Sequence, residues 1–316
     1  MLLAVSLSAC SSIDLRSAVA LCNPGLQTAA TYQQSIHALS PGLDNFIEGQ
    51  FLLVPLTGRP APDEALERSV ARIQSALSAR AAMLGQLAQV YTSFVALASY
   101  DASGQVKSSL AGLDGSINNF ATTLGATSPP ISSGAAAQLT DAGGLIAAQA
   151  QKRKTLEASA AIRARLGPII ELLGTENERY QDLQAVITNG LKDTAVALLM
   201  HDLATPDEII REQIGAFGLT YTPGSYRAAC AGGDADRRAQ CRKAFDQAVT
   251  GAIADRAVRL ATWQTQAIAS NQAALAGLVA AHQRFEQGQP LDLAGVTAQL
   301  ALIRGIVDDI NNAQKS

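Results

Sequence analysis

Apolar residues recur every three or four positions along most of this chain, and this spacing restricts its fold more than any other feature. From Leu66 to Phe94 the bulky side chains fall on one helical face, interrupted only by Arg80. A second stripe runs from Val106 to Leu124 and stops before a pair of prolines. Each stripe must be covered by another helix. The sequence therefore predicts an all-α fold, an elongated antiparallel bundle of long helices.

Local start and stop signals predict the other helices of the bundle. A helix that starts after Ser133 should kink or break at Gly167-Pro168, because proline cannot continue the backbone hydrogen bonds. Four further helices follow start signals, and the longest of them is capped by an aspartate and runs to Phe285. These four signals lie at Thr175, Thr205, Asp234 and Pro290, and the helix after Thr205 should end near Phe217.

Residues 41–62 do not fit the helical pattern. They place an apolar stretch from Phe46 to Val54 between prolines and glycines, which is too apolar for a solvated loop. We expect an irregular, extended strap that packs along the bundle. The alternative is a patch that docks a partner or touches a membrane, with Phe51 and Leu53 as candidate contacts.

The first twelve residues have the pattern of an exported protein. Met1 leads into a short apolar run, which is followed by Leu7-Ser8-Ala9-Cys10 and then by two serines. This pattern resembles a bacterial lipoprotein signal. The resemblance implies a signal peptide over residues 1–9, cleavage after Ala9 and a lipid anchor on Cys10. No basic residue precedes the apolar run, so we expect a missing upstream stretch.

The same resemblance implies a location. Ser11, rather than aspartate, follows the lipidated cysteine, which in Gram-negative lipoproteins favours the outer membrane, facing the periplasm, with surface exposure left open. We expect a tether over residues 10–27 and a single bundle domain over residues 28–316. No later stretch has the ~20 apolar residues of a membrane-spanning helix, so the expected membrane contact is the lipid.

Cysteine usage fits an oxidising compartment. If Cys10 is acylated, three cysteines remain, and one disulfide is expected among them. Cys230 and Cys241 are the local candidates, because the turn at Gly232-Gly233 allows the chain to fold back on itself. The rival pairings join Cys22 to one of these two cysteines.

No motif predicts catalysis or a bound cofactor. The three histidines, His37, His201 and His282, stand apart in the sequence, and no Glu-x-x-His pair or zinc-ligand spacing is present. His282 and Glu286 share a helical face, where a solvated ion pair is expected. We therefore predict no catalytic residue, no metal and no cofactor, and a protein that is not an enzyme.

Arginines near the inner faces of the predicted helices are the remaining candidates for ligand contacts. Arginine beside an aromatic ring can bind an anion, and the candidates are Arg80, Arg256, Arg259 and Trp263. The alternative is that these arginines extend along the bundle with their charged ends in water, or pair with acids of other helices. The net charge of −3 argues against nucleic acid as a partner.

Three classes of function stay open. The first is a lipid-anchored structural or interaction protein with an envelope protein as partner, which an exposed apolar groove beside Phe46 to Val54 would favour. The second is a binding module for a small anionic ligand or peptide, which a closed pocket lined by Arg80, Arg256 or Trp263 would favour. The third is an enzyme, which would need carboxylates or histidines that converge from distant helices.

Overall fold

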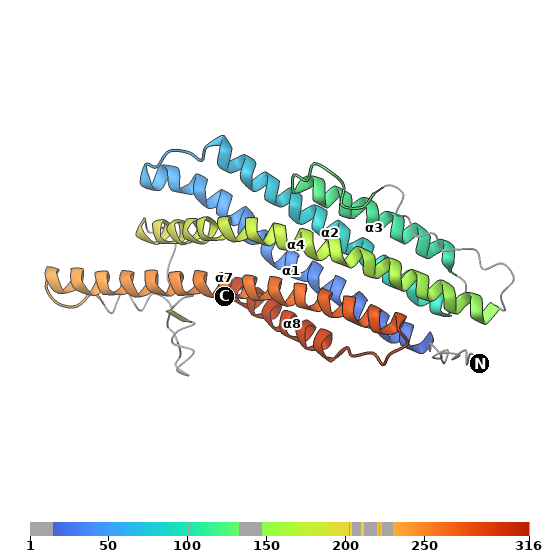
Figure 1. The fold of residues 1–316 in the computed structure, drawn as a ribbon. Helices are drawn as coiled ribbons and strands as arrows, with labels where there is room; N and C mark the ends of the chain where they lie inside the picture. The colour runs from blue at the N-terminus through green and yellow to red at the C-terminus, as the bar shows by residue number, and fades with distance from the viewer. Residues whose placement is uncertain are drawn as a thin grey trace, which may run out of the picture. The chain divides into compact units, whose positions relative to one another are not determined.

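A computed structural model describes residues 15–99, 102–132, 147–201 and 230–315, with isolated positions at 203, 210, 211, 220 and 222. The fold is all-α, as predicted, and helices pack as a bundle. The described residues contain six helices and no strand (Figure 1). The helices are α1 (Leu15–Thr57), α2 (Glu64–Ser99), α3 (Ser103–Thr123), α4 (Ala147–Met200), α7 (Ala235–Glu286) and α8 (Ala294–Lys315).

The chain folds into two compact units, whereas the sequence suggested one bundle domain. The described residues within Met1–Gln34, Ala76–Glu176 and Ala269–Ile303 form unit 1, and those within Ser35–Ser75, Asn177–Ile268 and Arg304–Ser316 form unit 2. Every described helix except α3 contributes residues to both units. A long amphipathic helix can contribute to two units because its apolar stripe continues along its length. Successive segments of the stripe can then pack against different helices.

The core of unit 1 confirms the predicted apolar stripes of α2 and α3. The bulky stripe residues of these helices that lie in unit 1 are buried, together with residues from α4 and α7. The rings of Phe94 and Phe285 meet edge to face, with centroids 6.3 Å apart. The fully buried stripe residues of α2 and α3 include Leu84, Leu87, Phe94, Val106, Leu110, Leu113, Ile117 and Phe120.

The predicted tether over residues 10–27 is wrong from Leu15 onward. Helix α1 begins at Leu15, and Ala18, Leu21 and Cys22 are fully buried in unit 1. Burial of apolar side chains at this helical spacing stabilises the folded chain, whereas a solvated linker would leave them exposed to water. The predicted signal peptide and Cys10 lie outside the described residues.

The predicted irregular strap over residues 41–62 is also wrong for most of its length. Helix α1 continues to Thr57, and only the segment from Gly58 to Asp63 is irregular. Phe46 and Leu53, seven positions apart, are almost fully buried, and this packing outweighs the cost of proline within the helix. Gly58 has a φ of +69°, a conformation that ends a helix readily only at glycine.

Helix α4 is continuous where the sequence predicted a kink or break. Pro168 lies inside it, between Leu166 and Ile169, which are both fully buried. Thr175 does not cap a new helix, because its hydroxyl donates to the carbonyl of Glu171 one turn earlier at 3.2 Å. The helix start expected after Ser133 and the short helix expected over 205–217 lie outside the described residues, apart from Ile210 and Arg211.

Helices α1 and α4 approach each other closely within unit 2. A Cβ atom at Gly190 of α4 would overlap the ring of Phe46 of α1, and a Cβ at Gly49 of α1 would crowd Thr194 of α4. The glycines therefore let the two backbones come together. Phe46 packs there in a cluster with Val70 and Ile187, against which Ile47, Leu66, Ile73 and Leu191 pack.

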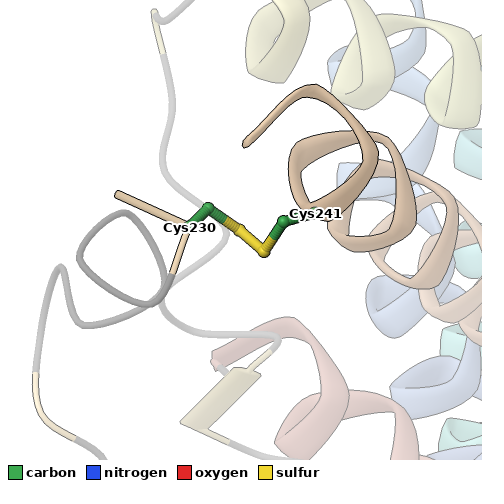
Figure 2. Close-up of a disulfide and its surroundings, with 2 residues drawn as sticks. All are labelled: Cys230 and Cys241. Atoms are coloured by element: carbon green, nitrogen blue, oxygen red, sulfur yellow. A yellow bond between two sulfur atoms is a disulfide. The ribbon is translucent and has the colours of Figure 1, made fainter. Parts of the chain in front are cut away.

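The start of α7 carries the disulfide that the sequence favoured. Cys230 and Cys241 are bonded, with Cα atoms 5.5 Å apart, and Figure 2 shows Cys230 beside the first turns of α7, which hold Cys241. Asp234 caps the helix by accepting a hydrogen bond from the backbone N–H of Arg237 at 2.8 Å. Cys22 is a free, buried thiol. Closing this short loop stabilises the folded chain by about 3 kcal/mol in the chain-entropy model.

Candidate functional site

A buried chain of polar side chains runs through the core of unit 1. The Tyr91 hydroxyl lies 3.1 Å from His282 Nε2, and Ser159 Oγ lies 2.8 Å from His282 Nδ1. Ser159 donates to Glu286 at 3.2 Å, so its oxygen is free to accept from Nδ1–H. The network therefore assigns the proton of His282 to Nδ1 and leaves Nε2 as the acceptor for Tyr91.

This buried hydrogen-bond network corrects the prediction for His282 and Glu286. His282 is fully buried and its hydrogen bonds join Tyr91 and Ser159, so it forms no solvated ion pair with Glu286. The carboxylate of Glu286 instead accepts from Arg163 Nε, at 3.0 and 3.1 Å to its two oxygens, and from Ser159. The polar groups of the cluster are hydrogen-bonded to one another, so the cluster acts as a structural network. It fixes the positions of side chains from α2, α4 and α7.

Burial holds His282 in its neutral form. Desolvation lowers the pKa of His282 to about 3, and the positive charge of Arg163 acts in the same direction. Burial also raises the pKa of Tyr91 well above its usual value, so its hydroxyl stays a donor.

This shift predicts a loss of stability in mild acid. Because the pKa of His282 is lower in the folded chain, the unfolded chain binds more protons as the pH falls below ~6.5. The free energy of unfolding therefore keeps its full value above that pH and falls progressively toward pH 3. Its slope approaches ~1.4 kcal/mol per pH unit. Urea unfolding between pH 7 and pH 5 should show this slope in the wild type and a flatter one in His282→Gln. The exposed His201 supplies the control, since His201→Gln should keep the wild-type slope, and equal slopes in all three proteins would refute the prediction.

Arg80, a predicted ligand contact, is committed to a buried ion pair in unit 1. Its Nη1 lies 2.6 Å from Oε2 of Glu176 on α4, and the two side chains are 5% and 8% exposed. The guanidinium also lies over the ring of Tyr32, 5.5 Å from its centroid. Burial raises the pKa of Glu176, and Arg80 partly offsets this rise. The structure thus supports the alternative for Arg80, an acid partner on another helix.

The other predicted contact residues lie in unit 2. Trp263 is half-buried and packs against the buried cluster of Ala267, Ile306 and Ile310. Arg256 is half-buried and Arg259 is exposed, one turn of α7 apart. Leu53 is buried, whereas Phe51 keeps 46% of its surface exposed.

A groove of about 400 Å³ lies in unit 2, beside the apolar stretch between Phe46 and Val54. Its apolar lining comes from the end of α1 and the last turns of α4, where Leu53 and Ala197 are buried and Met200 is 76% exposed. Its polar lining includes Arg59, which holds Asp193 at 3.0 Å in an exposed ion pair. The full lining is Leu53, Leu56, Thr57, Arg59, Lys192, Asp193, Val196, Ala197, Met200, His201 and Thr250.

The polar residues of this groove carry no signal in the sequence. Arg59 and Asp193 are 134 positions apart, and neither belongs to a motif. Among the residues that line the groove, none is Arg80, Arg256 or Trp263. In the described part of the chain, no group of three or more His, Cys, Asp or Glu side chains is placed to hold a metal ion.

One helix in the described residues, α2, is long and apolar enough to cross a membrane by length and composition alone. Its best 18-residue window has a mean hydropathy of 1.3, and 44% of that window is buried. Core helices pass the same test, and Met83, Leu84 and Leu87 of α2 are fully buried in unit 1. The finding is therefore weak support for a membrane span.

In the described residues, the protein is all-α, with one local disulfide and a groove beside the end of α1 and the last turns of α4. No protein-family model matches its sequence, and comparisons with curated proteins and with solved structures also give no match.

Proposed function

We propose that this protein is a lipid-anchored component of the bacterial cell envelope that serves as a helical interaction protein for an envelope partner. The observation that carries the proposal is the sequence Leu7-Ser8-Ala9-Cys10 behind an apolar run, which resembles a lipoprotein signal. The anchor would hold the bundle at the outer membrane, on its periplasmic side.

The environments of the other cysteines support this assignment. The sequence has four cysteines, of which Cys230 and Cys241 are joined to each other. Cys22 is buried, its thiol donates to the carbonyl of Ala18 at 3.1 Å, and burial raises its pKa to about 12. A thiol in that position is inert as a nucleophile in the folded chain. Cys10 is left as the cysteine available for a lipid, and the disulfide suits an oxidising envelope.

Exposed apolar side chains on α1 support a protein partner. Phe51 and Leu52 are consecutive and keep 46% and 47% of their surface exposed. They lie in the stretch that also contributes Leu53 to the groove of unit 2. Exposed neighbouring apolar side chains of this kind favour contact with another protein.

The proposal is tested by fractionating envelopes of a Gram-negative host that expresses the full chain. We expect the wild-type protein in the outer-membrane fraction, and Cys10→Ser in the soluble periplasmic fraction, because one changed atom removes the acylation site. Cys22→Ser is the matched control, since it removes a neighbouring thiol and should leave the protein at the membrane. Membrane association that survives Cys10→Ser, or that is lost in Cys22→Ser alone, would contradict the proposed anchor.

A further inference from the structure

We infer that the groove of unit 2 is a binding site for a single-chain amphiphile with a carboxylate head, such as a medium-chain fatty acid. This site goes beyond the proposed anchoring and partner roles, and it does not depend on them. Three properties of the groove support the assignment: its size, its apolar lining and the excess of positive charge around it.

The size of the groove suits a small ligand. Ligand pockets in proteins commonly enclose ~300–1,000 Å³, and this groove has about 400 Å³. That volume is at the small end of the range and is sufficient for one medium-length alkyl chain.

The lining offers an apolar path of the kind that an alkyl chain needs. Leu53 is 2% exposed, and Leu56 and Val196 are half-buried, so these side chains form the covered part of the groove. Met200 projects into solvent beside them and can fold over a bound chain, because its thioether side chain is flexible. An alkyl chain in the groove would remove this exposed apolar surface from water.

The charges at the groove select the head group. Among the described residues that line the groove, Arg59 and Lys192 are cationic, His201 adds an imidazole, and Asp193 is the only acid. This described lining therefore carries an excess of positive charge, which attracts an anion and disfavours an amine.

The ion pair of Arg59 marks where a carboxylate would sit. Arg59 Nη1 holds Asp193 Oδ2 at 3.0 Å, and the two side chains are 56% and 38% exposed. An exposed pair of this kind contributes little net stability, so a ligand carboxylate can displace Asp193 or bind beside it. The guanidinium has five donors in a fork that matches a carboxylate, which makes Arg59 the head-group clamp.

Calorimetric titration of the full chain with decanoate tests the inference. We expect wild-type binding with a Kd below ~1 mM, Arg59→Gln to weaken it about tenfold, and Asp193→Asn to strengthen it about fivefold because the clamp loses its competitor. Decanol, which has the same chain without the charge, should bind at least about tenfold more weakly than decanoate. Arg68→Gln is the matched control, since Arg68 is an exposed arginine of unit 2 that pairs with Glu64 on its own helix, and it should leave the Kd unchanged.

Several results would overturn the inference. No saturable decanoate binding below ~1 mM would do so, as would equal Kd values for decanoate and decanol or an Arg59→Gln protein that binds like the wild type. Circular dichroism should show all variants folded, because the substituted side chains are exposed. Failure of this test leaves the envelope fractionation of Cys10→Ser unaffected, so the two proposals stand or fall separately.

Discussion

The variant Glu176→Gln is expected to lose about 3–5 kcal/mol of folding free energy. The change leaves the Arg80 guanidinium buried beside a neutral amide, and the cost of an uncompensated buried charge exceeds that of the lost hydrogen bond. Urea denaturation followed by circular dichroism measures the loss. The matched control is Glu178→Gln, an exposed glutamate on the same helix, which should change the stability by less than ~0.5 kcal/mol.

The double variant Arg80→Met, Glu176→Leu separates the charge effect from packing. Apolar replacements of similar volume remove both charges together, and such replacements of buried pairs are commonly neutral or stabilising. We expect the double variant to recover most of the stability lost in Glu176→Gln. A double variant that is as unstable as the single one would show that the loss comes from packing and not from the unpaired charge.

The variant Gly25→Ala is expected to cost about 1–3 kcal/mol of folding free energy through overpacking. A Cβ atom at this position of α1 would overlap the ring of Tyr91, which is fully buried and cannot move aside without strain. A displaced ring would also lose its hydrogen bond to His282, which adds to the cost. Thermal and urea unfolding of the variant measure the effect.

Gly115→Ala is the matched control for this substitution. Gly115 lies on the exposed face of α3, and a Cβ added there meets no atom within 4 Å. Alanine should therefore stabilise α3 by about 0.5–1 kcal/mol through its higher helix propensity. If Gly25→Ala were also stabilising, the close approach of α1 to Tyr91 would be wrong.

Periodicity was sufficient to predict the core helices α2 and α3, but it missed α1, which was predicted as a tether and an irregular strap. The stripes of α2 and α3 became buried faces, since burial follows directly from apolar spacing. The prolines misled the prediction, because local propensity treats Pro55 and Pro168 as helix breakers. Buried neighbours such as Leu53, Leu166 and Ile169 outweigh that local cost, and the sequence alone does not say which neighbours will be buried.

The disulfide was predictable for a local reason, and the groove was not. Cys230 and Cys241 are 11 positions apart across a glycine turn, so their pairing needed no knowledge of the tertiary fold. Arg59 and Asp193 meet only because α1 and α4 pack together in unit 2, and an exposed ion pair leaves no periodic signal. His282 was misjudged for the same reason, since its partners Tyr91 and Ser159 come from other helices.

The mass of the mature N-terminus tests the proposed lipid anchor most directly. Intact and peptide mass spectrometry of the protein purified from a Gram-negative envelope should find Cys10 as the first residue, carrying a diacylglycerol. The Cys22→Ser protein should carry the same modification, because Cys22 is a core thiol. A mature chain that retains residues 1–9, or one that begins at an unacylated Cys10, would contradict the account.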